Sequence, residues 1–358
     1  MKNKILSITF VIYIFIFFIL NIIIKDKDVS NIERRKLNKL PEFTFDNVIN
    51  GNISNDFENY ALDQFVLRDN YRKLKSLFEF KVYGKLDSNN LYVKNGYIFK
   101  IEYPLREDKV VNFTNKINKI YLNDLKGMNI YYSIIPDKNY YSKDNYLKMD
   151  YNRLINIVNN NINKNIKYID ITSDLELEDY YYSDIHWKQE KLDNVVRKLS
   201  KNMKFKVNTN YTYNEYSPFY GSYYGQLGLN TKYDKIIYLS NKTIDSAKVK
   251  DIENKIVKVY DKKLLKNKDS YDIYLGGSTP LIEVINNNTK SNKELVIFRD
   301  SFGSSLAPLL LDGYGKITLI DLRYIDYKML KDYIKFNNQD VLFIYNTNII
   351  NNSDMLRV

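Results

Sequence analysis

The chain has 358 residues, a formal net charge of +11, no cysteine and a single histidine, His186. The absence of cysteine excludes thiol nucleophiles, cysteine-based zinc sites and disulfides, and one histidine excludes motifs that place two histidines on a metal. The positive charge suits an anionic membrane surface or a polyanionic cell-envelope polymer. It is spread along the chain without an arginine cluster or a nucleic-acid motif, so we discount nucleic acid as a partner. We expect no metal and no cofactor.

Residues 5–24 form an uncharged apolar run. At about 1.5 Å per residue it is long enough to cross the roughly 30 Å hydrocarbon layer of a membrane. No small-residue cleavage pattern follows the run, so residues 1–26 are predicted to be an uncleaved signal anchor with one transmembrane helix. Lys2 and Lys4 favour a cytoplasmic amino end, although two lysines also lie on the other flank. The rest of the chain would then be extracytoplasmic.

The pattern changes from a polar stalk to an alternation of strands and helices at about residue 91. Residues 27–90 are polar with helically spaced apolar positions, which predicts a stalk and a helical entry segment. The Asn95-Gly96 pair between two short apolar runs predicts a tight hairpin, because both residues accept positive φ angles. Strand-like runs follow at 130–135, 167–171, 295–298, 317–320 and 341–345, with a helix at 109–125 and helical patterns around Leu154, Val195, Leu309 and Leu330. This alternation predicts an α/β domain over residues 91–358 with a mostly parallel sheet covered by helices.

Residues 208–270 interrupt that alternation with a tyrosine-rich, glycine-punctuated and irregular texture. We interpret this segment as an insertion near the functional site. Tyrosine rings stack well on sugars. Taken alone the tyrosines decide nothing, and a sugar platform formed by the aromatic residues of 208–225, Tyr220 among them, is a hypothesis for a site that acts on sugars.

His186 follows Asp184 by two residues and precedes the only tryptophan, Trp187. Imidazole suits a general base because its pKa lies near neutrality, and a nearby carboxylate can fix its tautomer and stabilise the imidazolium. A structural histidine with an aromatic neighbour is the alternative. The choice between them depends on a nucleophile.

Ser301 is the best candidate for that nucleophile. An apolar strand at 295–298 ends abruptly before it, and a helical pattern begins after a turn of small residues. A strand-to-helix elbow exposes a hydroxyl at the carboxyl edge of an α/β sheet and directs helix-start amides at a developing oxyanion. The alternative is an ordinary turn in which Ser301 or Ser304 caps the helix.

Several short blocks occur in one order along nearly the whole chain. They are Glu33-Arg34-Arg35-Lys36-Leu37 with Pro41-Glu42-Phe43, Pro136-Asp137-Lys138, Tyr182-Ser183-Asp184-Ile185-His186-Trp187, Pro218-Phe219-Tyr220-Gly221, Leu275-Gly276-Gly277, Arg299-Asp300-Ser301 and Asp321-Leu322-Arg323-Tyr324. In this order they resemble the DHHW family and the related alginate O-acetylation proteins, which are SGNH hydrolase-like acyltransferases. The resemblance implies a three-layer α/β/α sandwich.

The resemblance also implies that Asp184, His186 and Ser301 form a catalytic triad. Two positions depart from the related patterns: Ile185 replaces a histidine of the family motif, and Arg299 replaces the glycine found before Asp-Ser in ordinary SGNH enzymes. The second departure leaves the oxyanion-hole geometry open. The expected oxyanion and substrate-binding residues are Phe302, Gly303, Gly276, Gly277, Arg323, Trp187 and Tyr220, although the two adjacent glycines could equally be turn residues.

The expected function is membrane-anchored, extracytoplasmic O-acetylation of a cell-surface polysaccharide through an acetyl-serine. A multi-spanning membrane acyltransferase is the expected acetyl donor, on the resemblance alone. A carbohydrate esterase with the same triad is the first alternative. A non-catalytic polysaccharide-binding or scaffold protein is the second.

Overall fold

The structure is a computed structural model that describes residues 2–30, 32–33, 35–143, 146–229, 231–253, 255–267, 269–289 and 291–358. Arg34 of the family-like segment lies outside these residues. The chain forms two compact units, each described here by itself. The first comprises Met1–Leu91 and Ser222–Thr231, and the second comprises Tyr92–Gly221 and Lys232–Val358.

The first unit is built from helices around a two-stranded sheet. Its elements are α1 (Lys2–Ile23), β1 (Val29–Ser30), β2 (Arg35–Lys36), α2 (Phe45–Ile49), α3 (Asn52–Gln64), α4 (Arg68–Lys81) and α8 (Ser222–Leu227). Helix α1 is long and apolar enough to cross a membrane, as the sequence predicts, and a signal sequence would pass the same test. Leu67 adopts a left-handed conformation directly before α4 and separates it from α3.

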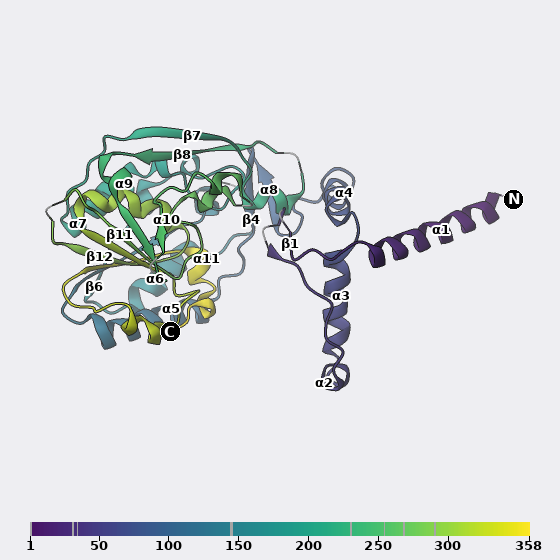
Figure 1. Cartoon of the computed structure of the whole chain (residues 1–358), viewed down its shortest axis with the longest axis horizontal. Helices are drawn as coiled ribbons and strands as arrows, with labels where there is room; N and C mark the ends of the chain where they lie inside the picture. The colour runs from purple at the N-terminus through teal and green to yellow at the C-terminus, as the bar shows by residue number, and fades with distance from the viewer. Residues whose placement is uncertain are drawn as a thin grey trace. The chain divides into compact units, whose positions relative to one another are not determined.

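The core of the second unit is an eight-stranded sheet of order β10-β9-β11-β13-β12-β14-β5-β6 (Figure 1). The strands are β10 (Ile256–Val257), β9 (Lys248–Asp251), β11 (Leu281–Ile285), β13 (Lys316–Ile320), β12 (Glu294–Arg299), β14 (Asp340–Asn346), β5 (Asn129–Ile135) and β6 (Ile166–Tyr168). The five strands from β13 to β6 are mutually parallel, and β11, β9 and β10 extend the sheet by antiparallel pairing. The predicted mostly parallel sheet is confirmed.

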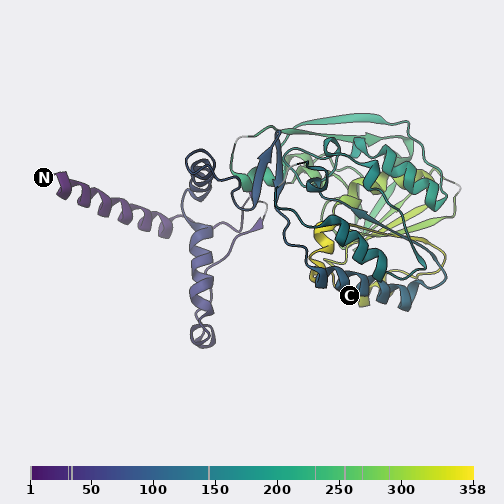
Figure 2. The same ribbon diagram turned by 180° about the vertical axis from the view of Figure 1, so that it is seen from behind.

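Helices cover both faces of this sheet (Figure 2). Helices α5 (Glu107–Ile120) and α6 (Tyr151–Asn161) pack on one face, and α7 (Asp193–Met203) and α10 (Phe302–Leu306) pack on the other. Side chains of β12 alternate between the two cores, because successive strand residues point to opposite faces. This arrangement confirms the predicted three-layer α/β/α sandwich.

Several local predictions hold, and others need correction. Strands β3 (Leu91–Lys94) and β4 (Tyr97–Lys100) form the predicted hairpin, with positive φ at Asn95 and Gly96. The helix predicted at 109–125 begins with α5 and ends as a π-helical turn, Tyr121–Leu125. The patterns around Leu309 and Leu330 form 3-10 helices, Ala307–Gly313 and Tyr327–Asp332, and the first contains Pro308, which cannot donate a helical hydrogen bond.

The segment at 208–270 is more ordered than its sequence suggests. Strands β7 (Thr212–Phe219) and β8 (Asp234–Ser240) pair antiparallel within it, with an irregularity between Tyr216 and Phe219. Helix α9 (Lys242–Ser246) and strands β9 and β10 follow, and α11 (Thr347–Ile350) lies near the carboxyl end of the chain. The expectation of an irregular insertion was wrong in this respect.

Candidate functional site

Ser301 lies at the carboxyl end of β12, directly before α10. This is the edge at which open parallel sheets place ligands. The residue is partly exposed, whereas the residues that follow it in α10 are buried. The elbow predicted from the sequence is therefore present, and it leaves the serine accessible.

The Ser301 hydroxyl does not cap the helix. It makes no capping hydrogen bond to the described part of α10, and the buried Ser304 hydroxyl has no hydrogen-bond partner among the described residues. The capping role belongs to Asp300, whose carboxylate accepts the N–H of Phe302 at 3.0 Å and that of Asn346 at 2.6 Å. Burial raises the pKa of this carboxyl. The alternative in which one of the two serines caps the helix is thus not what the structure shows.

His186 connects Ser301 to Asp184. Its Nε2 lies 2.8 Å from Ser301 Oγ, and its Nδ1 lies 2.6 Å from Asp184 Oδ1. The same carboxylate oxygen accepts the backbone N–H of His186 at 3.1 Å. Asp184 is fully buried and His186 nearly so. With its Nδ1 proton donated to Asp184, the ring presents Nε2 as an acceptor for the serine proton.

The Tyr271 ring packs against one face of the His186 imidazole. The two rings stack at 3.8 Å between centroids with an interplanar angle of 6°, and the Phe302 ring lies 4.9 Å from the imidazole. The Tyr271 hydroxyl donates to Ser305 Oγ at 2.8 Å, and burial raises the pKa of this phenol well above its usual value. Sequence reasoning missed Tyr271, because it lies in a short 3-10 helix, Ser270–Ile273, with no motif around it.

Lys138 and Asp234 hold the turn that carries Asp184. The buried Lys138 ammonium donates to the carbonyls of Tyr181, Tyr182 and Asp184 at 2.8–3.2 Å. Burial lowers the pKa of Lys138 to about 7, opposed by the carboxylates of Asp234, Asp184 and Asp137.

Asp234 accepts three hydrogen bonds from the same turn. They come from the N–H of Tyr182 at 2.8 Å and from the N–H and hydroxyl of Ser183 at 2.8 and 2.6 Å. Because an ammonium and a carboxylate both hold the backbone of this turn, the position of Asp184 is fixed by charged hydrogen bonds.

Two expected substrate-binding aromatic residues occupy different environments. Trp187 is fully buried, and its indole N–H donates to the carbonyl of Phe302 at 3.2 Å and to Ser305 Oγ at 2.9 Å. It therefore supports the Ser301 turn from behind, and the expectation that it contacts substrate is not met. Tyr220 is exposed, and its ring lies edge-on to that of Tyr233 with 6.2 Å between the centroids. Phe219 is buried and cannot belong to the expected sugar platform.

The expected oxyanion donors are engaged in turns. The Phe302 amide donates to Asp300 Oδ1, and the Gly303 amide donates to the Asp300 carbonyl at 3.1 Å. Gly276 and Gly277 have φ of 75° and 79°, and the Gly277 amide donates to the Tyr274 carbonyl at 3.3 Å. Gly276 and Gly277 are therefore turn residues in this conformation.

Arg323 is held by Asp321. Its Nε and Nη2 donate to the two carboxylate oxygens at 2.8 and 2.6 Å, and this pairing raises its pKa against the opposing effect of burial. Arg299 is buried beside the same carboxylate, with Nη1 at 3.4 Å from it. A side chain at position 303 would contact the Arg299 side chain, which explains the glycine after Ser301-Phe302.

Comparisons with known proteins identify the fold of the chain. Neither protein-family models nor curated proteins give a match. Among solved structures, a DHHW family protein from Eubacterium siraeum is similar with a TM-score of 0.61 and 19% identity, covering 75% of this chain and 94% of that one. Bacillus cereus PatB1 is similar with a TM-score of 0.58 and 16% identity, covering 73% of this chain and 96% of its own. The O-acetyltransferase domain of Pseudomonas putida AlgJ gives a TM-score of 0.42 at 9% identity, covering 73% of this chain and 92% of that one. The chain therefore has the α/β fold that the DHHW family protein and PatB1 share.

Proposed function

We propose that the protein is a membrane-anchored O-acetyltransferase that modifies a cell-surface polysaccharide outside the cytoplasm. The observation that carries this proposal is the contact of the partly exposed Ser301 hydroxyl with His186, itself hydrogen-bonded to the buried Asp184. The motif order that resembles the DHHW family supports an acyl-transfer chemistry, the fold shared with a DHHW family protein agrees with it, and α1 supports the anchor. A multi-spanning membrane acyltransferase is proposed as the acetyl donor.

In the proposed reaction Ser301 is the nucleophile and His186 the base. Ser301 Oγ attacks the acetyl carbonyl while its proton passes to His186 Nε2, and Asp184 stabilises the imidazolium that forms. The imidazolium then protonates the leaving group, which leaves an acetyl-serine. A sugar hydroxyl then attacks this ester while its proton passes to His186 Nε2, and His186 returns that proton to Ser301 Oγ as the acetyl group leaves on the sugar, which regenerates both residues.

Transfer needs an acceptor hydroxyl that is held close to the acetyl-serine. Well-oriented groups reach effective molarities of about 10⁵ M or more, enough for a bound sugar to compete with solvent water. We propose that exposed tyrosines, Tyr220 among them, contribute to the acceptor surface. Arg323 and the amides around Gly303 and Gly276 remain proposed contacts to the acyl group, and Arg323 and the Gly303 amide would have to exchange their present partners.

The test supplies an activated acetyl ester to the full-length protein, with and without oligosaccharides of the native polymer. Acetylated sugar is expected from the wild type and is expected to vanish in Ser301→Ala and His186→Ala, since the chain has no second imidazole to substitute. Ser304→Ala is the matched control, because Ser304 is buried on the same turn and contacts neither His186 nor Asp184 through a described hydrogen bond.

The covalent intermediate can be tested separately. PatB1 is known with a sulfonyl adduct, and a sulfonyl fluoride should likewise modify this chain at Ser301 if that hydroxyl is activated. Mass spectrometry of peptides should locate the adduct at Ser301 in the wild type and show none in His186→Ala. Adducts spread over several surface residues, unaffected by His186→Ala, would contradict the proposed nucleophile.

The esterase alternative rests on the same three residues. It would be favoured if free acetate were the sole product whatever acceptor was offered. If no ester produced an acyl-serine, the binding or scaffold role would be favoured.

A further inference from the structure

Helix α4 carries a stripe of exposed apolar side chains. Tyr71, Leu74 and Phe78, with Leu67 just before the helix, are spaced by four, three and four residues and share one face. These four side chains are between 38% and 56% exposed. A soluble helix normally turns such a stripe toward its core.

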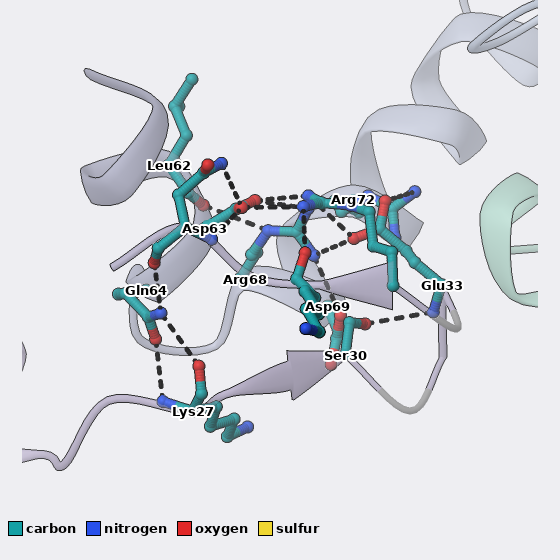
Figure 3. A network of polar contacts seen from close by, with 12 residues as sticks. Lys27, Ser30, Glu33, Leu62, Asp63, Gln64, Arg68, Asp69 and Arg72 are labelled. Atoms are coloured by element: carbon teal, nitrogen blue, oxygen red, sulfur yellow. Dashed lines mark hydrogen bonds and ion pairs between the residues drawn. The ribbon is translucent and has the colours of Figure 1, made fainter. Parts of the chain in front are cut away.

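Arg68 and Arg72 of α4 belong to an ion-pair network within the unit (Figure 3), whereas Lys73, Lys75 and Lys81 of the same helix are exposed. Arg68 binds Glu33 at 2.6 Å and Asp63 at 3.3 Å, and Arg72 binds Glu33 at 3.1 Å. Arg35 also donates to Asp63 and, as the largest cause, lowers the pKa of that carboxyl to about 2. The Asp63 carboxylate therefore stays ionised near neutrality, and the ion pairs around it fix the helix with its apolar face exposed.

The corner between α3 and α4, residues 65–67, packs on the carboxyl-terminal half of α1. The Phe65 and Phe17 rings stack at 5.9 Å with an interplanar angle of 6°, and the backbone N–H of Val66 donates to Asn21 at 2.9 Å. Farther along α1, the Tyr13 and Tyr71 hydroxyls lie 2.8 Å apart. α1 thus contacts the corner and the first turn of α4.

The positions of these contacts along α1 show how far they lie from the carboxyl end of that helix. Tyr13 and Phe17 precede the end of α1 at Ile23 by ten and six residues, which correspond to about 15 and 9 Å of helix. If α1 crosses a membrane, Phe65 and Tyr71 lie below the level at which the helix emerges. In Figures 1 and 2, α3 runs across the direction of α1, as expected for a helix parallel to a bilayer that α1 crosses.

An apolar groove of about 1250 Å³ lies between α1 and α3. Aromatic side chains line much of it, including those of Phe17, Phe57, Tyr60 and Phe65. Lys25 and Asp26 lie at the end of α1 on the same groove. An apolar channel with charged groups at one end matches the chemistry of a phospholipid, whose acyl chains are apolar and whose headgroup is polar.

We propose that α4, the 65–67 corner and the groove form a lipid-binding surface that sits in the bilayer interface beside α1. The proposal rests on the proposed membrane anchor and adds a second, monotopic attachment to it. The stripe of Leu67, Tyr71, Leu74 and Phe78 would lie among acyl chains, while the inward Arg68 and Arg72 remain paired with Glu33 and Asp63. Burying such a stripe in the interface is the usual behaviour of a membrane-surface amphipathic helix.

The absence of cysteine allows a direct test with single spin labels on the full-length chain in phospholipid bilayers. Labels are placed by Leu74→Cys and Phe78→Cys on the stripe, and by Lys73→Cys as the matched exposed position off the stripe of the same helix. Ile12→Cys in α1 and Lys164→Cys in the second unit serve as membrane and water references. Collision rates with oxygen, which concentrates in hydrocarbon, and with a water-soluble nickel complex are then measured by electron paramagnetic resonance.

The expected result is high oxygen and low nickel accessibility at positions 74 and 78, as at position 12, with the reverse at positions 73 and 164. If labels at positions 74 and 78 were highly accessible to nickel while the label at position 12 gave a lipid-like signal, the lipid-binding surface would be overturned and the anchor would stand. Low accessibility to both reagents would mean that a second copy of the chain covers the stripe, which also overturns the proposal. A water-like signal at position 12 would overturn the anchor itself. Circular dichroism of each labelled variant controls for folding.

Discussion

Gly221 is packed against the turn that carries Asp184, and replacing it with alanine should damage activity more than stability. A Cβ at this position would lie 2.3 Å from the carbonyl oxygen of Ser183 and 2.4 Å from the Asp184 Cβ, whereas ordinary contacts are 3.4–4 Å. The turn would therefore have to move by about 1 Å, the difference between those distances. Such overpacking costs about 1–3 kcal/mol of unfolding free energy. In domains of this general size the loss corresponds to a fall in Tm of roughly 2–12 °C.

The catalytic effect should exceed this because the displaced group is the carboxylate that orients His186. A 1 Å misplacement of a catalytic group costs about 10²-fold in rate. We expect Gly221→Ala to lose about that factor in kcat/KM for an activated acetyl ester. Gly313→Ala is the matched control, since its Cβ would lie 2.4 Å from the buried Phe205 ring and contacts no residue of the site. Equal losses of kcat/KM in the two variants at equal falls in Tm would refute the reasoning.

Three further predictions concern side chains of the second unit. Trp187→Phe removes the N–H that the Phe302 carbonyl and Ser305 Oγ accept. It should lower the unfolding free energy by about 1–3 kcal/mol in urea titrations, and an unchanged midpoint would show that these bonds carry no stability. Asp234→Asn sets an amide N–H₂ against donors of Tyr182 and Ser183, so it should lower the unfolding free energy by about 2–4 kcal/mol. Ser183→Ala should lower it by about 1 kcal/mol. If thermal unfolding gave the larger loss to Ser183→Ala, the role assigned to Asp234 would be contradicted. Burial raises the pKa of Glu190 from 4.5 to about 7, so its stabilising contribution is complete below pH 4.5 and is lost as pH rises through 7. Wild type should therefore lose up to about 3 kcal/mol relative to Glu190→Gln between pH 4.5 and 8, and parallel pH profiles of the two proteins would contradict this.

The sheet and the contact of Asp184, His186 and Ser301 could be predicted from the sequence because most of their signals are local. An apolar run followed by small residues defines the β12 elbow, and Asp184 and His186 are two residues apart. The contact of Ser301 with His186 spans 115 positions. It was inferred because the chain has one imidazole and because the motif order resembles a known family.

The residues that support the site could not be predicted from the sequence, because each contacts residues far away along the chain. Tyr271 stacks on an imidazole 85 positions away, and Gly221 is constrained by the Ser183 backbone 38 positions away. The β7–β8 hairpin lacked a signal for a different reason. Most side chains of β7 are exposed or half-buried, so its sequence does not alternate between apolar and polar residues.

The burial of Trp187 behind the Ser301 turn gives the protein an internal optical reporter. Its indole is the only one in the chain, and its N–H is bonded to the carbonyl of Phe302, the residue next to Ser301. Intrinsic emission therefore comes from one position, without interference from a second fluorophore of the same kind. A shift of the turn on acylation of Ser301 would change the indole's hydrogen bonding and hence its emission maximum. Stopped-flow emission could follow the proposed acetyl-serine in the unmodified protein, with neither label nor chromogenic substrate.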